Sequence, residues 1–301
     1  MHSVEVSKHF NRPPSPLRPG VESAWALQVA MFLFGAPPFL FPATTFDFFT
    51  GEAQPQERSL RVAHDCFALL CLHAMAFGVL SAFALRARDG AFRLGFARAS
   101  SVFLVVWMSA LASGLLESPE RYGLAAGVLF LPGLFMLSLN VRHLLRTRLT
   151  VSRPHRDALP PAPLWTSVWW SAQAFLSVAT GLATFVWARP LLRAFVQPSV
   201  PVHVMAPHQL RFSSAYAVLY GALSVMAMRT SRRGAWRLLT LPLALWPALT
   251  LVVILLRWDL SLYTALTWRF LAPAAVAALV NGAAAASQRS AWGDAHEGDG
   301  G

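Results

Sequence analysis

Eight apolar blocks, each close in length to one helical crossing of a membrane, divide this chain of 301 residues. A transmembrane helix needs roughly 20 predominantly apolar residues in succession. Hydrophobic residues make up 55% of the chain and charged residues 13%, which is too apolar for an ordinary soluble domain. We therefore predict an all-α integral membrane protein with eight transmembrane helices. The blocks lie at about 24–46, 62–85, 100–116, 122–140, 165–187, 212–228, 239–256 and 264–286.

One segment of the sequence occurs twice, about half a chain apart. GVLSAFALRARDGAFRL, from Gly78 to Leu94, aligns with GALSVMAMRTSRRGAWRL, from Gly221 to Leu238, with a single one-residue gap. Nine positions are identical, whereas shared composition alone gives about one or two identities in such a window. The segment therefore indicates an internal duplication.

Isolated matches extend the duplication to both halves of the chain. Trp25 and Trp165 begin the two halves, and Asn140 and Asn281 end them. Each half holds four of the apolar blocks. Because four is an even number, both halves enter the membrane from the same side. We predict two parallel four-helix repeats, related by a pseudo-two-fold axis along the membrane normal.

Composition divides the chain into five parts. Prolines and polar residues near the N-terminus discourage helix formation, and a second stretch rich in arginine and proline separates the two halves. The C-terminal sequence is polar and rich in glycine, which is typical of disorder. The parts are a polar N-terminal arm (1–23), a first four-helix module (24–140), a basic Pro-rich linker (141–164), a second four-helix module (165–286) and a disordered tail (287–301).

Positive charge gathers in alternate loops, those after the second, fourth and sixth apolar blocks. The positive-inside rule then places these loops, the linker and both termini in the cytoplasm, with the protein in the inner membrane. The net charge of +11 reflects this topology, so we predict no nucleic-acid partner. The arginine loops are expected to contact the anionic head groups of the lipid bilayer.

Ionisable residues gather near the non-cytoplasmic ends of the predicted helices. His64 and Asp65 begin the second helix, Glu117 ends the third, and His208 and Arg211 begin the sixth. Charged side chains at membrane depth are costly and mark functional sites. One hypothesis is a polar vestibule on the outer face, in which these residues contact a ligand. The alternative is that they are interfacial caps and anchors, since an acidic residue near a helix N-terminus suits the helix dipole.

His73 lies about three turns further along the second helix than His64, and the duplication aligns it with Tyr216. Both side chains can donate a hydrogen bond from an otherwise apolar wall. Either they make a polar contact between packed helices, or they contact a ligand.

Two classes of function agree with these features. The first is a non-enzymatic protein that binds or translocates a small lipophilic or amphipathic molecule, or that supports a membrane complex. The alternative is a membrane-embedded enzyme acting on a lipid or isoprenoid, with Asp65 or Glu117 as acid and His64 or His208 as base.

No metal or cofactor is predicted. The histidines form no HxH or HExxH pattern, and the two cysteines form no CxxC pattern. A bis-histidine haem would place histidines in equivalent helices of both halves, but His73 aligns with Tyr216.

Each module resembles the DoxX-like family of four-helix membrane proteins. The shared features are prolines at the end of the first helix, a glycine in the second helix, and a basic turn after it. In the first module these are Ala36-Pro37-Pro38, Gly78 and the turn from Arg86 to Arg93. In the second module they are Arg189-Pro190, Gly221 and the turn from Arg229 to Arg237. The resemblance implies a four-helix architecture for each module and assigns no catalytic residue.

Overall fold

The structure is a computed structural model that describes residues 19–34, 40–44, 58–87, 90–147, 164–229, 233–257, 259 and 261–297. Within these ranges the chain is helical, and it forms no strand apart from an isolated bridge between Val196 and Tyr263. The all-α prediction is therefore confirmed. The main helices are α1 (Pro19–Leu33), α4 (Arg58–Arg86), α5 (Gly90–Glu117), α6 (Pro119–Thr147), α7 (Leu164–Val186), α8 (Ala188–Phe195), α9 (Met205–Arg229), α10 (Arg233–Arg257) and α11 (Trp268–Glu297), with a 3-10 turn η2 at Ala265–Thr267.

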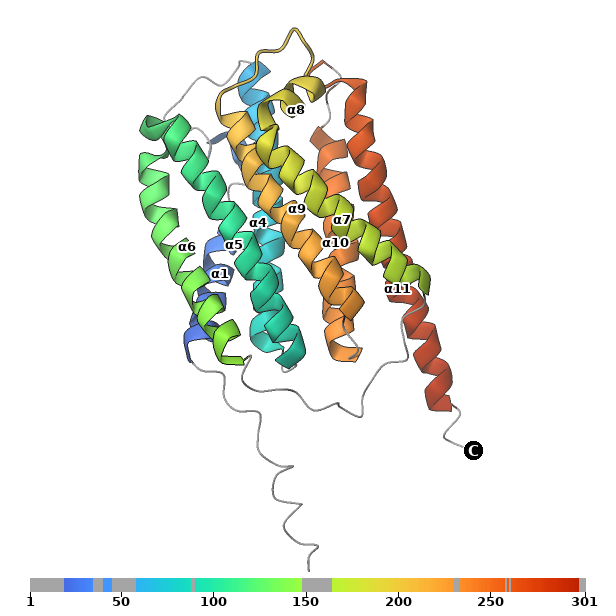
Figure 1. Cartoon of the computed structure of the whole chain (residues 1–301). Helices are drawn as coiled ribbons and strands as arrows, with labels where there is room; N and C mark the ends of the chain where they lie inside the picture. Colours follow the sequence, from blue (N-terminus) through green and yellow to red (C-terminus); the bar gives the residue numbers. More distant parts are fainter. Residues whose placement is uncertain are drawn as a thin grey trace, which may run out of the picture.

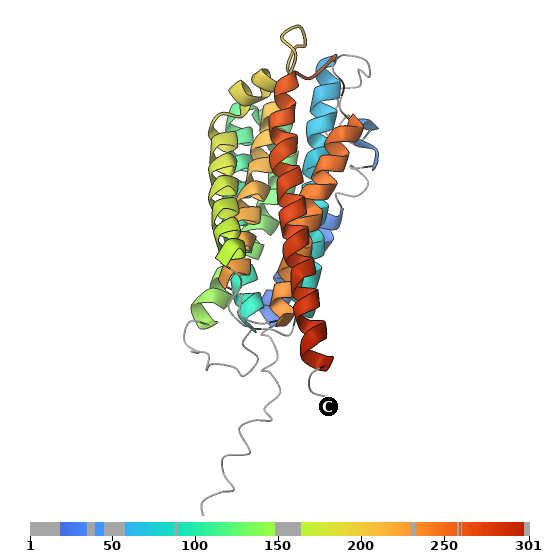
Figure 2. The same cartoon turned by 90° about the vertical axis from the view of Figure 1, so that its right-hand side faces the viewer.

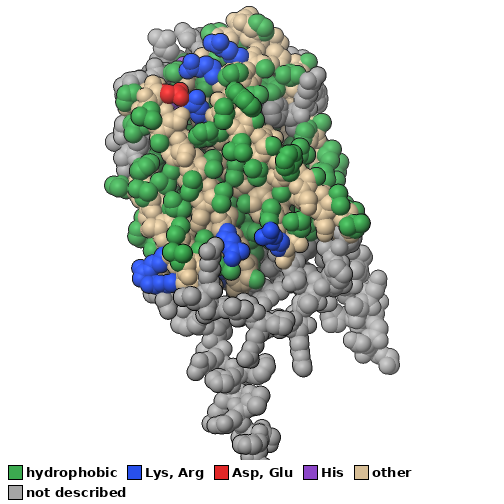
Figure 3. Space-filling model, viewed as in Figure 1, with side chains coloured by type: hydrophobic (Ala, Val, Ile, Leu, Met, Phe, Trp, Pro, Cys, Tyr) green, Lys and Arg blue, Asp and Glu red, His purple; other side chains and the backbone are tan. Residues whose placement is uncertain are grey.

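Within the described ranges, five helices are long and apolar enough to cross a membrane: α4, α5, α9, α10 and α11. A sixth span is present if α7 and α8, which meet at an angle of 97°, count as one broken span. On the face drawn in Figure 3, Lys and Arg side chains gather at the two ends of the bundle, and hydrophobic side chains cover the belt between them. This arrangement fits an α-helical membrane protein.

The long helices run side by side in one bundle (Figures 1 and 2). Helix α1 begins and α11 ends at the same end of the bundle, while α8 lies at the other end. One group of helices packs through the pairs α1 with α4, α1 with α6 and α5 with α6. A second group packs through α7 with α9, α9 with α10 and α10 with α11. The two groups meet where α9 contacts α4 and α5, and where α4 contacts α10.

Several helices begin or end away from the limits of the predicted parts. Helix α1 begins at Pro19, inside the predicted arm, because proline is well accommodated in the first turn of a helix. It ends at Leu33, whereas the first apolar block continued to residue 46. Helix α6 continues to Thr147 into the predicted linker, and α11 continues to Glu297 into the predicted tail. Both extensions lack proline and contain good helix formers, leucine and arginine in α6 and alanine in α11.

Helices α7 and α9 approach each other through two glycines. A Cβ atom added to Gly181 would lie 2.9 Å from the backbone oxygen of Ser214, and one added to Gly221 would lie 3.0 Å from that of Ala174. A Cβ on Gly78 of α4 would lie 3.1 Å from the backbone of α1. Small residues allow such close packing between helices in a membrane, where dispersion contacts rather than water exclusion hold helices together.

A network of buried side-chain hydrogen bonds joins α1, α4, α5 and α6. The indole nitrogen of Trp25 donates to Asn140 Oδ1 at 3.0 Å, and Asn140 Nδ2 donates to Ser100 Oγ at 3.2 Å. Gln28 Nε2 donates to the same Ser100 oxygen at 2.9 Å, and Ser81 Oγ donates to Gln28 Oε1 at 3.2 Å. We call these five residues the first network. It satisfies polar groups that would otherwise be costly in an apolar interior.

The second group of helices contains a matching network. Trp170 donates to Asn281 Oδ1 at 3.1 Å, Asn281 Nδ2 donates to Gln173 Oε1 at 2.8 Å, and Gln173 Nε2 donates to Ser224 Oγ at 2.8 Å. Asn281 Nδ2 also lies 3.1 Å from the hydroxyl of Tyr220. We call these residues the second network. They come from α7, α9 and α11, which the predicted duplication pairs with α1, α4 and α6.

In both networks a buried tryptophan donates to the asparagine, Trp25 in the first and Trp170 in the second, whereas the sequence matched Trp25 to Trp165. In both networks the tryptophan is followed three residues later by a glutamine. The networks differ in the hydroxyl that contacts the asparagine, which is supplied by Ser100 in the first and by Tyr220 in the second.

Candidate functional site

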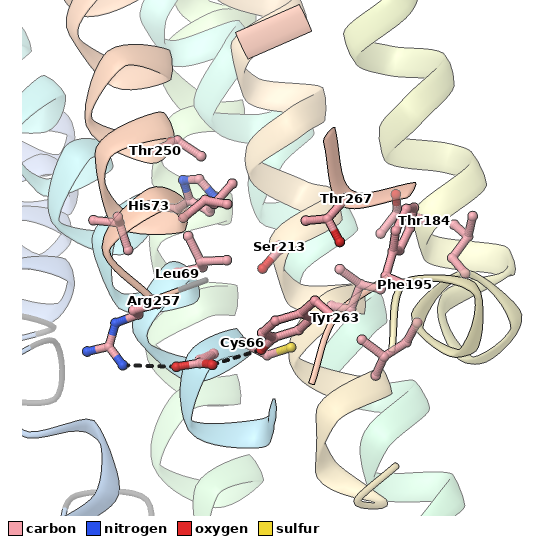
Figure 4. Close-up of a pocket in the computed structure, with 16 residues that line it drawn as sticks. Cys66, Leu69, His73, Thr184, Phe195, Ser213, Thr250, Arg257, Tyr263 and Thr267 are labelled. Atoms are coloured by element: carbon pink, nitrogen blue, oxygen red, sulfur yellow. Dashed lines mark hydrogen bonds and ion pairs between the residues drawn. The ribbon is translucent and has the colours of Figure 1, made fainter. Parts of the chain in front are cut away.

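The candidate site is a cavity of about 240 Å³ that is bounded by α4, α7, α8, α9, α10 and the segment before α11. The surface that faces into it is largely carbon, contributed by side chains such as Leu192, Leu210 and Val253. Figure 4 shows Arg257 and Tyr263 toward one end of the cavity, with His73 and Thr250 farther along the bundle. Its character is therefore that of an apolar chamber with a few polar groups, as is usual for small-molecule sites.

An ion pair with a tyrosine forms the polar end of the cavity. Arg257 Nη1 donates to Asp65 Oδ1 at 3.1 Å, and the hydroxyl of Tyr263 donates to Asp65 Oδ2 at 2.8 Å. Burial, together with the neighbouring carboxylate, raises the pKa of Tyr263. The phenol therefore keeps its proton, and both carboxylate oxygens receive a hydrogen bond. This arrangement compensates the charge of a side chain that is only 11% exposed.

Helix α8 covers the cavity at the same end. Leu191, Leu192 and Phe195 face the cavity, while Arg189 and Arg193 on the same short helix are exposed. This two-sided character is typical of a helix at a membrane interface.

Backbone hydrogen bonds attach the end of α8 to the segment that carries Tyr263. Gln197 N donates to Leu262 O, and Thr264 N donates to Phe195 O, each at 2.8 Å. Residue Tyr263 itself forms the bridge with Val196. These contacts hold the tyrosine in position to donate to the carboxylate of Asp65.

A second group of charged residues joins α5 to α9. Arg211 donates to Glu117 and, at 2.7 Å, to the hydroxyl of Ser113. His208 Nε2 lies 3.8 Å from Glu117 Oε2. In this group the acidic residue ends one helix and the basic residues begin the other. In the Asp65–Arg257 pair the acidic residue instead lies near the beginning of its helix, and the basic residue ends the other helix.

A row of aromatic rings and His73 crosses the junction between the two groups of helices. Its ring centroids are 4.3 to 5.9 Å apart between successive members. The row is Phe77, Phe103, Tyr216, His73, Trp246 and Tyr220. We call it the aromatic row. In addition, the indole nitrogen of Trp246 donates to His73 Nδ1 at 2.8 Å.

The predicted site residues fall into two places. Asp65 and His73 line the cavity, and Tyr216 contacts His73 with ring centroids 5.7 Å apart. His64 precedes Asp65 on α4 and is half-buried. The charged group that joins α5 to α9 contains the remaining predicted residues, which are not among those that line this cavity: Glu117, His208 and Arg211.

Sequence reasoning left three important residues out of the site. Trp246, Thr250 and Tyr263 carry no motif, and they lie about 170 to 200 residues from the residues they contact or face on α4. One signal was visible, because Tyr263 is one of only four tyrosines in the chain and lies just beyond an apolar block. Among the described residues, no group of His, Cys, Asp and Glu side chains could hold a metal ion.

Neither protein-family models, nor curated proteins, nor solved structures match this chain. The resemblance of each module to the DoxX-like family therefore stays a prediction.

Replacing Arg257 with glutamine is expected to lower the free energy of unfolding by about 1–2 kcal/mol, because Asp65 would lose its compensating charge. The expected loss is moderate because Arg257 is 30% exposed. A double-mutant cycle with Asp65→Asn, measured by unfolding in mixed micelles, should show that the double variant recovers most of this loss. Additive losses would contradict a coupled pair.

Proposed function

We propose that this chain is a multi-pass inner-membrane protein of eight spans, with both termini in the cytoplasm, which binds a small lipophilic or amphipathic molecule in the cavity beside Asp65. Its spans form two parallel four-helix repeats, α1, α4, α5 and α6 followed by α7, α9, α10 and α11. The molecule reaches the site from the bilayer, and binding involves no covalent chemistry.

The pairing of equivalent residues supports the repeat. The aromatic row contains two pairs of positions that the duplication aligns, 73 with 216 and 77 with 220, and a third pair, 103 with 246, that lies one position away from the alignment. If each residue is replaced by the other member of its pair, the row has the same six residues in the reverse order. The helix contacts show the same symmetry. If α4 is exchanged with α9 and α5 with α10, the contact between α4 and α9 is unchanged, and the contact between α5 and α9 becomes that between α10 and α4. Both are expected for two copies about a pseudo-two-fold axis between His73 and Tyr216.

The cavity itself carries the proposed function. Its wall is largely carbon, and its charged end is already neutralised by the Asp65–Arg257 pair. An apolar chain can move from water or lipid into this cavity while every charged group there stays paired. The same pairing weighs against the enzyme, since Asp65 and Glu117 each accept a hydrogen bond from an arginine.

Filling the cavity should abolish binding. Ser213 faces the cavity, so Ser213→Trp places an indole where the ligand would lie. A photoactivatable alkyl diazirine, added to the protein in nanodiscs, should label α8, α9 and α10 in the unaltered protein. Mass spectrometry of the labelled peptides should show at least about tenfold less labelling in the variant, equivalent to a loss of about 1.4 kcal/mol in binding.

A matched substitution on the lipid-facing surface provides the control. Ser138 is exposed on α6, and its hydroxyl bonds only to the backbone of its own helix. Ser138→Trp should leave the labelling of the cavity unchanged. Equal labelling of the cavity peptides in the Ser213→Trp protein would refute the proposed site.

A further inference from the structure

The hydrogen bond from Trp246 fixes the protonation of His73. An indole N–H can only donate, so His73 Nδ1, at 2.8 Å, must be the acceptor. A neutral imidazole with an acceptor at Nδ1 carries its proton on Nε2. His73 is therefore an uncharged side chain with one donor, Nε2–H, still to be used.

That donor is available to the cavity. His73 is one of the residues that line it (Figure 4). Within the described part of the chain, no residue accepts a hydrogen bond from His73 Nε2. This nitrogen is also not one of the unpartnered polar atoms that are completely buried, so it is accessible. A donor in an apolar chamber is most stable when a bound molecule supplies an oxygen acceptor.

Two hydroxyls offer the complementary acceptors. Thr250 donates its proton to the backbone oxygen of Trp246 at 2.9 Å, and Ser213 donates to that of Gln209 at 3.1 Å. Each hydroxyl has a single proton, which is already donated to the backbone. Its oxygen can therefore only accept a hydrogen bond from a molecule in the cavity. His73, Thr250 and Ser213 thus supply the cavity with one donor and two acceptors beyond the Asp65 end, and the hydroxyls of Thr184 and Thr267 line it as well.

The charge of the site is balanced before anything binds. Asp65 is paired with Arg257, and His73 is neutral. A carboxylate, phosphate or ammonium group would bring an uncompensated charge into a chamber of low polarity, which is strongly unfavourable. The site therefore disfavours both anionic and cationic head groups.

We propose that the cavity binds an uncharged long-chain molecule that carries a hydroxyl group, an alcohol or a phenol. Its hydroxyl oxygen accepts from His73 Nε2–H and its proton is donated to Thr250 or Ser213, while its chain lies against the carbon wall. This inference rests on the proposed function and adds the chemical class of the ligand.

A series of twelve-carbon probes tests the class directly. Dodecane, 1-dodecanol, laurate and dodecylamine would each compete with the alkyl diazirine for the cavity of the full-length protein in nanodiscs. We expect 1-dodecanol to displace the label at a concentration at least about tenfold lower than the other three. Equal displacement by dodecane, or better displacement by laurate or dodecylamine, would overturn the inference while leaving cavity binding intact. If no probe displaces the label, the proposed function itself fails.

Substitutions then locate the hydroxyl. His73→Phe removes the donor, so it should weaken 1-dodecanol about tenfold and leave dodecane unchanged. His143→Phe is the matched control, because this histidine lies on α6 beside Trp25, away from the cavity. Since His73→Phe also leaves the Trp246 indole without its acceptor, Thr250→Val provides a second variant that keeps the side-chain shape. If both cavity variants retain the full preference for alcohol over alkane, the hydroxyl does not lie where we place it.

Discussion

Replacing Gly181 with leucine should force α7 away from α9 and produce one of the largest losses of stability available to a single substitution in this chain. A Cβ at this position would already lie 2.8 Å from the side chain of Val218 and 2.9 Å from the backbone oxygen of Ser214. A side chain can move aside, but the backbone of α9 cannot do so without moving the helix. We expect a loss of about 3 kcal/mol or more in the free energy of unfolding, above the usual range for overpacking. Unfolding by sodium dodecyl sulfate, followed by tryptophan fluorescence, measures it.

Two milder substitutions give this prediction its scale. Gly181→Ala adds only the Cβ and should cost about 1–3 kcal/mol. Gly282→Ala, in α11, meets no atom within 4 Å. It should be neutral or stabilise the protein by about 0.5–1 kcal/mol, as alanine does in a helix interior. An unfolding midpoint for Gly181→Leu equal to that of Gly282→Ala would show that α7 and α9 do not pack as described.

The helices themselves could be predicted because their physical cause is local. A stretch of about 20 apolar residues must form a helix in a bilayer, where no water satisfies the backbone. The structure accordingly contains a helix at each of the eight predicted blocks, although among the described residues only five helices, or six spans with the bent pair, meet the length and composition expected of a span. Helix ends were less predictable. The linker boundary was placed at residue 141, but α6 continues to Thr147 because nothing in that stretch terminates a helix.

Contacts between helices could not be predicted to the same extent. Apolar surface surrounds most of a membrane helix, so the pattern of the sequence does not identify which face meets which neighbour. The vestibule hypothesis grouped Asp65 with Glu117 because both lie at the same predicted membrane face. The structure instead pairs Asp65 with Arg257 and Glu117 with Arg211, and each pair joins a helix of the first group to a helix of the second.

The buried networks were closer to being predictable than the site. Asn140 and Asn281 were matched from the sequence, and both prove to be central to a network. The sequence match of Trp25 to Trp165 did not identify the tryptophan that bonds to Asn281, because three tryptophans lie close together in the second half, at 165, 169 and 170. The pattern Trp-x-x-Gln, present at 25–28 and 170–173, would have selected the correct one. The overlooked signal was therefore a glutamine inside an apolar block, at the same distance from a tryptophan in both halves of the chain.

Replacing Asn281 with leucine should destabilise the protein by about 2–4 kcal/mol, because several buried groups would lose their partner together. Its Oδ1 accepts from the indoles of Trp169 and Trp170, and its Nδ2 donates to Gln173 Oε1 at 2.8 Å. Hydrogen bonds between helices in membranes contribute on average only about 0.6 kcal/mol each. The predicted loss therefore depends on the number of groups that share this asparagine, and not on any one bond.

The same substitution in the first network tests that reasoning. Asn140 accepts from Trp25 and donates to Ser100, so Asn140→Leu removes fewer bonds and should cost less than Asn281→Leu. Ser109→Leu, at an exposed position on α5 whose hydroxyl bonds only to its own helix, should change the free energy of unfolding by no more than about 0.5 kcal/mol. A loss for Asn281→Leu no greater than that for Ser109→Leu would mean that the second network does not hold α7, α9 and α11 together.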